Sequence, residues 1–65
     1  MNAPDYATIK RAAAEVRRLA AAGELTRAAF DKQWKLARNA CGGDGDLLGG
    51  LARYAKPGWI NVQSE

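Results

Sequence analysis

A single glycine, Gly23, separates two alanine-rich basic segments and strongly constrains how this chain folds. Glycine ends a helix cleanly because, without a Cβ, it enters the left-handed conformation at the C′ position at no steric cost. Thr26 can then cap a second helix, since its hydroxyl accepts hydrogen bonds from backbone N–H groups that lack an intrahelical partner. Leu25, just before this cap, is spaced to contact Phe30 and to set the angle between the helices. Residues 19–26 therefore predict a helical hairpin.

The segment before the glycine predicts an amphipathic helix over about residues 3–22. Either Asn2 or Asp5 can act as its N-cap, because both side chains accept hydrogen bonds from free backbone N–H groups. Apolar residues recur at alternating steps of three and four, which places them on one side of a helix. This apolar face is expected to contain Tyr6, Ile9, Ala13, Val16 and Ala20, with Leu19 at its edge.

The segment after the glycine predicts a second helix over about residues 27–40, ended by a glycine-rich turn. Its expected apolar face consists of Phe30, Trp34, Ala37 and Cys41. Because many core positions of both helices are alanine, the helices can approach closely, but they bury little apolar area per residue. Large side chains must therefore supply most of the core.

A short third helix is expected over about residues 46–55, capped by Asp46 and facing the core with Leu47, Leu48, Leu51 and Tyr54. Gly49 and Gly50 each cost about 1 kcal/mol relative to alanine in a helix, so this helix depends on packing. Residues 57–65 follow as an extended tail. The predicted fold class is all-α: a helical hairpin plus a short third helix and an extended aromatic C-terminal tail.

Sixty-five residues form at most one small domain, residues 1–65, and a pocket deep enough to desolvate a substrate would consume most of its core. The chain has no histidine, and its only cysteine, Cys41, lies on an apolar helix face without a nearby base. We therefore expect no enzyme, no metal and no cofactor. The chain has no apolar run long enough for a membrane span and no signal-peptide pattern at its start, so we expect a cytoplasmic protein.

Positive charge is concentrated in the hairpin. Residues 10–38 hold eight Lys or Arg against three Asp or Glu, an excess of +5, whereas residues 1–9 and 39–65 each carry −1, giving the net +3. The expected basic face consists of Lys10, Arg11, Arg17, Arg18 and Arg38. Such a face can be simply solvated, can steer the protein to an acidic protein surface, or can contact phosphates of a nucleic acid.

The aromatic residues are the candidate anchors for a partner, because Trp and Tyr carry much of the binding energy at protein interfaces. We expect Trp34, Tyr54, Trp59 and Ile60 to supply this apolar anchoring. The tail has two alternatives: it folds back over the end of its own core, or it engages a partner as a strand or anchor. A homodimer with crossed tails or helices would satisfy both.

Residues 16–37 resemble the SHOCT (short C-terminal) module of bacterial proteins. The pattern is an apolar helix end, a glycine, an apolar–Thr pair, and a helix with Phe and later Leu. The matching residues are Leu19, Gly23, Leu25, Thr26, Phe30 and Leu36. The family's acidic residues before the Phe are replaced here by Arg27, Ala28 and Ala29. The resemblance implies an oligomerisation or docking unit.

The chain is also similar in type to small phage-encoded proteins that bind and block a host machine such as a CRISPR effector, a regulator or a motor ATPase. The sequence thus predicts a non-catalytic protein–protein interaction module, a small bacterial or phage accessory protein that binds and modulates or inhibits a larger, acidic-surfaced host protein. The alternatives are a basic nucleic-acid-binding accessory protein and a self-associating SHOCT-like oligomerisation module.

Overall fold

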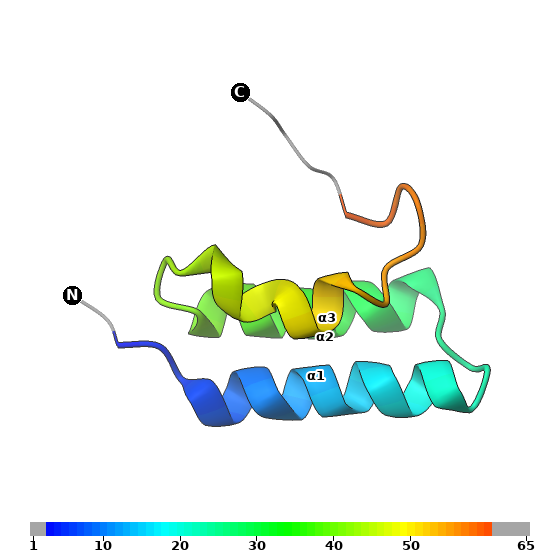
Figure 1. Cartoon of the computed structure of the whole chain (residues 1–65), viewed down its shortest axis with the longest axis horizontal. Helices are drawn as coiled ribbons and strands as arrows, with labels where there is room; N and C mark the ends of the chain where they lie inside the picture. The colour runs from blue at the N-terminus through cyan, green and yellow to red at the C-terminus, as the bar shows by residue number, and fades with distance from the viewer. Residues whose placement is uncertain (1–2, 61–65) are drawn as a thin grey trace.

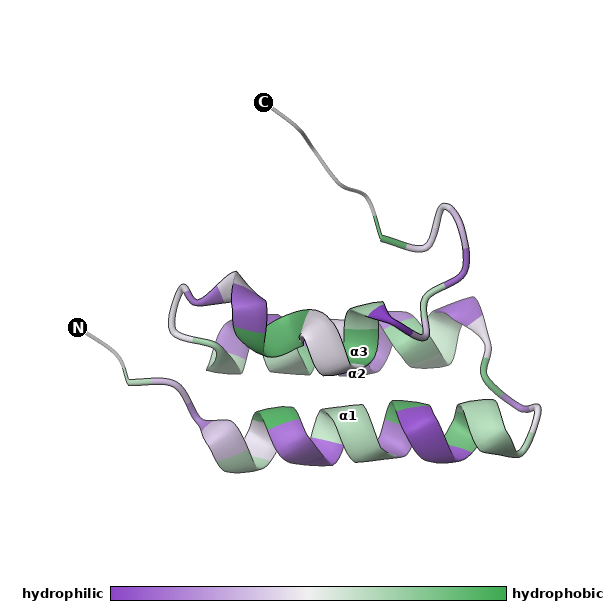
Figure 2. Cartoon of the chain, in the orientation of Figure 1, coloured by the Kyte–Doolittle hydropathy of each residue, from purple (hydrophilic) through white to green (hydrophobic). Residues whose placement is uncertain are grey.

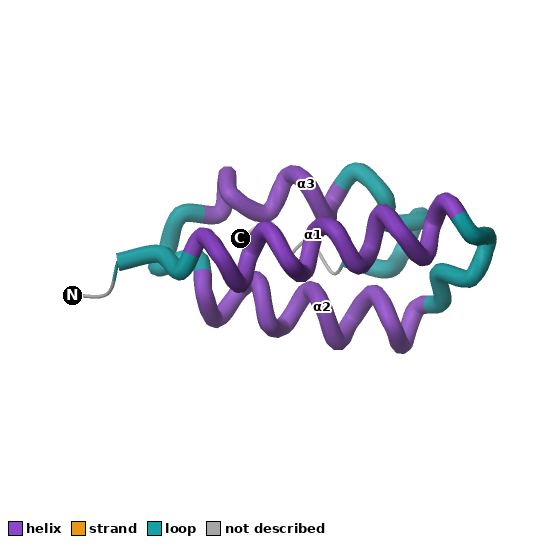
Figure 3. The backbone as a smooth tube through the Cα atoms, turned by 90° about the horizontal axis from the view of Figure 1, so that it is seen from below, coloured by secondary structure: helices purple, strands orange, loops and turns teal. Residues whose placement is uncertain are grey.

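The computed structural model describes residues 3–60, and within that range all regular structure is helical. The elements are α1 (Tyr6–Ala21), α2 (Arg27–Ala40), the 3₁₀ helix η1 (Gly45–Leu48) and α3 (Gly49–Ala52). Helices α1 and α2 run antiparallel as a hairpin, and η1 with α3 lies alongside them (Figure 1). Seen from below, α1 lies between α2 and α3 and packs on both (Figure 3). The predicted helical hairpin with a short third helix is confirmed.

Of the two N-caps expected for α1, Asp5 caps the helix, and Asn2 lies outside the described residues. The Asp5 carboxylate accepts hydrogen bonds from the Thr8 backbone N–H at 3.2 Å and from the Thr8 hydroxyl at 2.7 Å. These bonds, made by the charged form, lower the pKa of Asp5 below its ordinary value. The Asp5 N–H also donates to the Ala40 carbonyl at 2.7 Å. This bond ties the start of α1 to the end of α2.

The glycine hinge has the geometry that the sequence predicts. Gly23 has φ of 71°, and its N–H donates to the Ala20 carbonyl at 3.1 Å while the Glu24 N–H donates to the Leu19 carbonyl at 2.8 Å. These two bonds form a Schellman motif, which satisfies carbonyls that the end of α1 leaves free. The Thr26 hydroxyl then caps α2 by accepting from the Ala29 N–H at 3.2 Å.

We expect Gly23→Val to destabilise the protein by about 1–3 kcal/mol, because a β-branched residue is strained at positive φ. A Cβ at Gly23 would meet no atom within 4 Å, so the effect comes from the backbone alone. Urea unfolding followed by far-UV circular dichroism measures it. Gly23→Asn is the matched control, since asparagine visits this conformation readily. Equal losses for both variants would show that the backbone conformation at the hinge is not what matters.

The core lies where the three helices meet. Its buried members are Ile9, Ala12, Val16, Phe30, Ala37, Cys41, Leu48 and Leu51. The apolar face predicted for α2 is confirmed, with Trp34 half-buried beside the fully buried Phe30. Colouring by hydropathy shows α1 alternating between hydrophobic and hydrophilic residues around its axis, as in an amphipathic helix (Figure 2).

The predicted core position of Tyr6 is wrong, because its side chain is 58% exposed. The innermost alanine of this stretch is Ala12, 2% exposed, while Ala13 is half-buried. A face centred on Ile9, Ala12 and Val16 leaves Tyr6 about 90° away at 100° per residue. The spacing of apolar residues by three and four therefore predicts the buried positions in the middle of α1, but it is wrong for Tyr6, the first residue of the helix.

The third helical segment differs from the prediction at both ends. It begins as the 3₁₀ helix η1 at Gly45 and is α-helical only through Ala52. Asp46 does not cap it; Asp44 does, its carboxylate accepting from the Asp46 N–H at 3.1 Å. The turn before it closes early, since the Asp44 N–H donates to the Cys41 carbonyl at 3.1 Å. This puts Asp44 two residues ahead of the expected cap.

The described part of the tail folds back onto its own core as far as Ile60. The Trp59 ring lies 5.6 Å from the Phe30 ring between centroids, tilted by 42°, and Phe30 also stacks on Trp34 at 5.6 Å. Pro57 and Gly58 form a turn here, with the Trp59 N–H donating to the Lys56 carbonyl at 3.0 Å. The remainder of the tail, which the sequence predicts as extended, lies outside the described residues.

Candidate functional site

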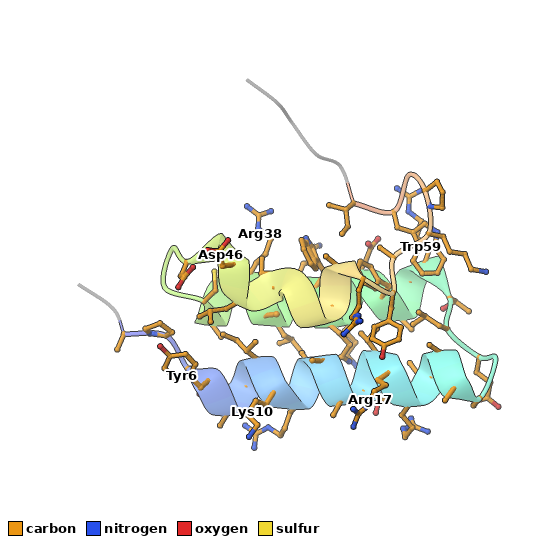
Figure 4. All side chains as sticks on the ribbon, in the orientation of Figure 1. Tyr6, Lys10, Arg17, Arg38, Asp46 and Trp59 are labelled. Carbon is orange, nitrogen blue, oxygen red and sulfur yellow. The ribbon has the colours of Figure 1, made fainter. Side chains whose placement is uncertain are left out.

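A groove of about 330 Å³ lies between α1 and the third helical segment. Its α1 side is lined by Lys10, Ala13, Ala14 and Arg17, and its other side by Gly50, Arg53 and Tyr54. Lys10 and Arg17 project from the outer part of α1 in Figure 4. The groove therefore brings two members of the predicted basic face together with one predicted aromatic anchor.

The helical repeat explains this arrangement. Lys10 and Arg17 are seven residues apart, so they occupy the same side of α1 about two turns from one another. Ala13 and Ala14, between them, offer only methyl groups and leave the floor low. Opposite, Gly50 has no side chain, and a Cβ built there would be 3.5 Å from the Ala13 Cβ, an ordinary contact distance. Small residues from both helical segments thus form the floor of the groove.

The charge of the groove is one-sided, because Lys10, Arg17 and Arg53 line it and no carboxylate does. Arg18, the next basic residue of α1, differs. Its guanidinium donates two hydrogen bonds to the Glu15 carboxylate, at 2.6 and 3.0 Å. This pairing raises the pKa of Arg18 and lowers the pKa of Glu15. The positive charge of Arg18 is consequently already paired, whereas Lys10 and Arg17 line the α1 side of the groove and Arg53 lines its other side.

The rest of the predicted basic face is dispersed. Arg11, Arg18 and Arg38 are exposed, and none of them lines the groove. Arg38 projects from α2 on the side of the molecule away from Lys10 and Arg17 (Figure 4). The five predicted basic residues therefore form no single surface, and only Lys10 and Arg17 share a recess.

The predicted aromatic anchors are half-buried against the core of the protein itself. Trp34 and Trp59 both pack on the Phe30 ring, and the Lys56 ammonium lies 5.8 Å from the centroid of the Trp59 ring. Ile60 contacts the same core. Only Tyr54 also borders the cationic groove. Its ring gives the groove an amphipathic wall beside the arginines.

Sequence reasoning missed Arg53. Its segment, residues 39–65, has a net charge of −1, and that sum hid a cation that the fold places opposite α1. The signal that could have found it is local: Arg53 directly precedes Tyr54, whose apolar spacing had already placed it on the packed side of the third helix.

A second groove, of about 570 Å³, lies at the open end of the hairpin, where α1 begins and α2 ends. Its lining consists of Ala3, Asp5, Thr8, Leu36, Asn39, Ala40 and Gly42. Leu36 is 45% exposed, whereas Leu48 and Leu51 are buried. This second groove is mostly uncharged and carries one carboxylate.

The described residues contain one cysteine and no cluster of metal-ligating side chains. Cys41 is buried as predicted, and its thiol donates to the Arg38 carbonyl at 3.1 Å. Across residues 3–60, no three His, Cys, Asp or Glu side chains come together as a metal site would require. Within the same residues, no helix is both long and apolar enough to cross a membrane.

Comparisons with known proteins gave no relatives. No family model, no curated protein and no solved structure matches the chain. The resemblance to the SHOCT module therefore stays a prediction from the residues.

Proposed function

We propose that this protein is a non-catalytic interaction module, a small accessory protein that binds and modulates a larger partner through an acidic surface of that partner. The observation that carries the proposal is the groove between α1 and the third helical segment (the α1–α3 groove), which Lys10, Arg17 and Arg53 line together with no carboxylate. A partner with complementary charge removes the mutual repulsion of these cations. The groove therefore favours an anionic partner over a neutral one.

The residue types at the groove also suit a protein partner. Arg and Tyr are enriched among the residues that dominate binding energy at protein interfaces, and the groove holds Arg17, Arg53 and Tyr54. Tyr54 is half-buried against the core, so its ring is held in place before binding and loses little freedom on contact. The exposed cations outside the groove, such as Arg11, would mainly increase the association rate.

Affinity capture with charge-reversed variants tests this function. The tagged protein and a Lys10→Glu/Arg17→Glu variant are incubated with lysate of the source cells, and bound proteins are quantified by mass spectrometry. Arg27→Glu/Lys35→Glu is the matched control, because both residues are exposed on α2, outside both grooves, and the charge change is the same. We expect a partner retained by the control and depleted about tenfold or more by the groove variant. Identical capture by all three proteins would contradict the proposal.

Nucleic-acid binding is the alternative function for the same cations. Non-specific DNA binding rests on contacts between cations and phosphates, so its affinity falls steeply as the salt concentration rises. A titration of duplex DNA against the protein at increasing salt decides between the two. A sub-micromolar complex at low salt that weakens steeply as salt increases would show that the partner is a nucleic acid and not a protein.

A second candidate function is self-association, and the exposure of Leu36 favours it. This residue belongs to the pattern shared with SHOCT modules, yet it lies outside the core and borders the second groove. Light scattering measures the mass of the protein in solution. A dimer that Leu36→Arg converts to a monomer would support self-association, while a monomeric wild-type protein would exclude it.

A further inference from the structure

From the α1–α3 groove we infer the form of the partner element: an acidic amphipathic helix with two carboxylates about two turns apart and an apolar side chain between them. This inference rests on the proposed function and specifies what the groove receives. Of the two grooves, this is the one that combines several cations with an apolar floor, and none of its cations belongs to the Arg18–Glu15 ion pair.

The register comes from α1. Lys10 and Arg17 are separated by seven residues, which is about 10.5 Å along the helix axis. Two carboxylates on one face of a second helix have the same separation when they too are seven residues apart. A helix lying along α1 can therefore pair both cations at once, and charge-assisted hydrogen bonds of this kind are about twice as strong as neutral ones.

The floor of the groove specifies the centre of the partner element. Ala13 and Ala14 stand three and four residues after Lys10, so their methyl groups lie between the two cations. On a partner helix in the matching register, the residues three and four after the first carboxylate face these methyls. Apolar side chains there would bury against Ala13, Ala14 and the Tyr54 ring.

Arg53 makes the groove asymmetric. It enters from the third helical segment, across the groove from Lys10 and Arg17, and it is exposed. A helix in the groove is thus flanked by cations on both sides, whereas a helix lying on the part of α1 that carries Arg18 would meet a cation already paired with Glu15. Ala13, Ala14 and Gly50 form a low floor, and small residues of this kind let a partner helix approach closely.

Two synthetic peptides test the register. Both are alanine-based helices of about 20 residues, long enough to be helical in water, and they have the same composition. In the first, two glutamates stand seven residues apart with leucines three and four after the first glutamate. In the second, the glutamates stand five residues apart, on different faces. Fluorescence anisotropy at low salt is expected to show the first peptide binding the protein about tenfold more tightly.

Two substitutions of equal charge test the position. Ala14→Glu puts a carboxylate among the cations of the groove, and Ala28→Glu puts one on α2 outside both grooves; both alanines are exposed in helices, so circular dichroism should show an unchanged fold. In the same assay at about 0.15 M salt, where charges more than about 8 Å apart are largely screened, we expect Ala14→Glu to weaken binding of the first peptide about tenfold or more, and Ala28→Glu about twofold or less. Arg53→Ala is expected to weaken it as well.

Other outcomes would overturn the inference. Equal affinity for the two peptides, or equal losses for Ala14→Glu and Ala28→Glu, would show that the peptide binds by general charge attraction and not in the groove. Displacement of the peptide by millimolar inorganic phosphate, at matched ionic strength, would assign the cations to a phosphate ligand instead. If neither peptide binds while the charge-reversal capture still succeeds, the proposed function stands and the acidic helix is wrong; if both fail, both are wrong.

Discussion

Phe30→Ala is expected to reduce the free energy of unfolding by about 3–5 kcal/mol, the usual cost of removing a buried phenylalanine. The Phe30 side chain is 0% exposed and contacts both Trp34 and Trp59, each with ring centroids 5.6 Å away. A domain of 65 residues has a total stability of about 3–10 kcal/mol. This single substitution therefore removes a large share of it.

Urea unfolding monitored by far-UV circular dichroism measures this loss, and tryptophan fluorescence adds a local signal. Because Trp34 and Trp59 both pack on Phe30, we expect their emission to shift to the red in the variant even before urea is added. Leu36→Ala is the matched control on the same helix, since Leu36 is 45% exposed and its removal should change stability by about 0.5 kcal/mol or less. Similar unfolding midpoints for the two variants would refute the central role of Phe30.

The hairpin could be predicted from the sequence because its determinants are local. Gly23 and Thr26 act on backbone groups within five residues of themselves, and each adopts the conformation that its chemistry favours. Which side of α1 faces the core was harder to predict, because Ala12 and Ala13 are identical residues and only packing decides which one is buried. That choice rotated the predicted face and misplaced Tyr6.

The start of the third helical segment shows a different limit. Asp44 and Asp46 are both suitable caps, and the choice between them depends on how tightly the preceding glycine turn closes. Gly42 and Gly43 both take positive φ. Residue propensities do not predict where the extended backbone of the N-cap residue begins after such a turn. The prediction chose the later aspartate because helix formers follow it directly.

The groove combines predictable and unpredictable parts. Lys10 and Arg17 share one side of α1 by helical spacing alone, so the sequence contains half of the site. Arg53 joins them only because α3 packs beside α1, a contact between segments about 40 residues apart that no local pattern encodes. The predicted aromatic anchors needed the same information, since Trp59 meets Phe30 only after the chain has turned back.

Leu51→Ala is expected to cost about 2–5 kcal/mol, because the Leu51 side chain is 0% exposed and leaves a cavity when truncated. Helix α3 has only four residues, two of them glycines, and a helix of that length has no stability of its own in water. Leu51 is the buried side chain of α3, and Leu48 is that of the preceding η1, so truncating Leu51 weakens the main attachment of α3 to the core. We expect the groove to lose its binding capacity as well, because Arg53 and Tyr54, which line it, come directly after α3.

Two measurements on the same variants separate global from local effects: the urea midpoint and the affinity for the acidic peptide with glutamates seven residues apart. Gly49→Ala is the matched control of opposite sign. Gly49 is helical, with φ of −58° and ψ of −31°, and an added Cβ would meet nothing within 4 Å, so alanine should stabilise α3 by about 0.5–1 kcal/mol. If α3 belongs to the cooperative unit, Leu51→Ala lowers the midpoint and Gly49→Ala raises it. An unchanged midpoint for both variants would contradict the prediction and make α3 a separately unfolding segment, in which case Leu51→Ala would lower the peptide affinity alone.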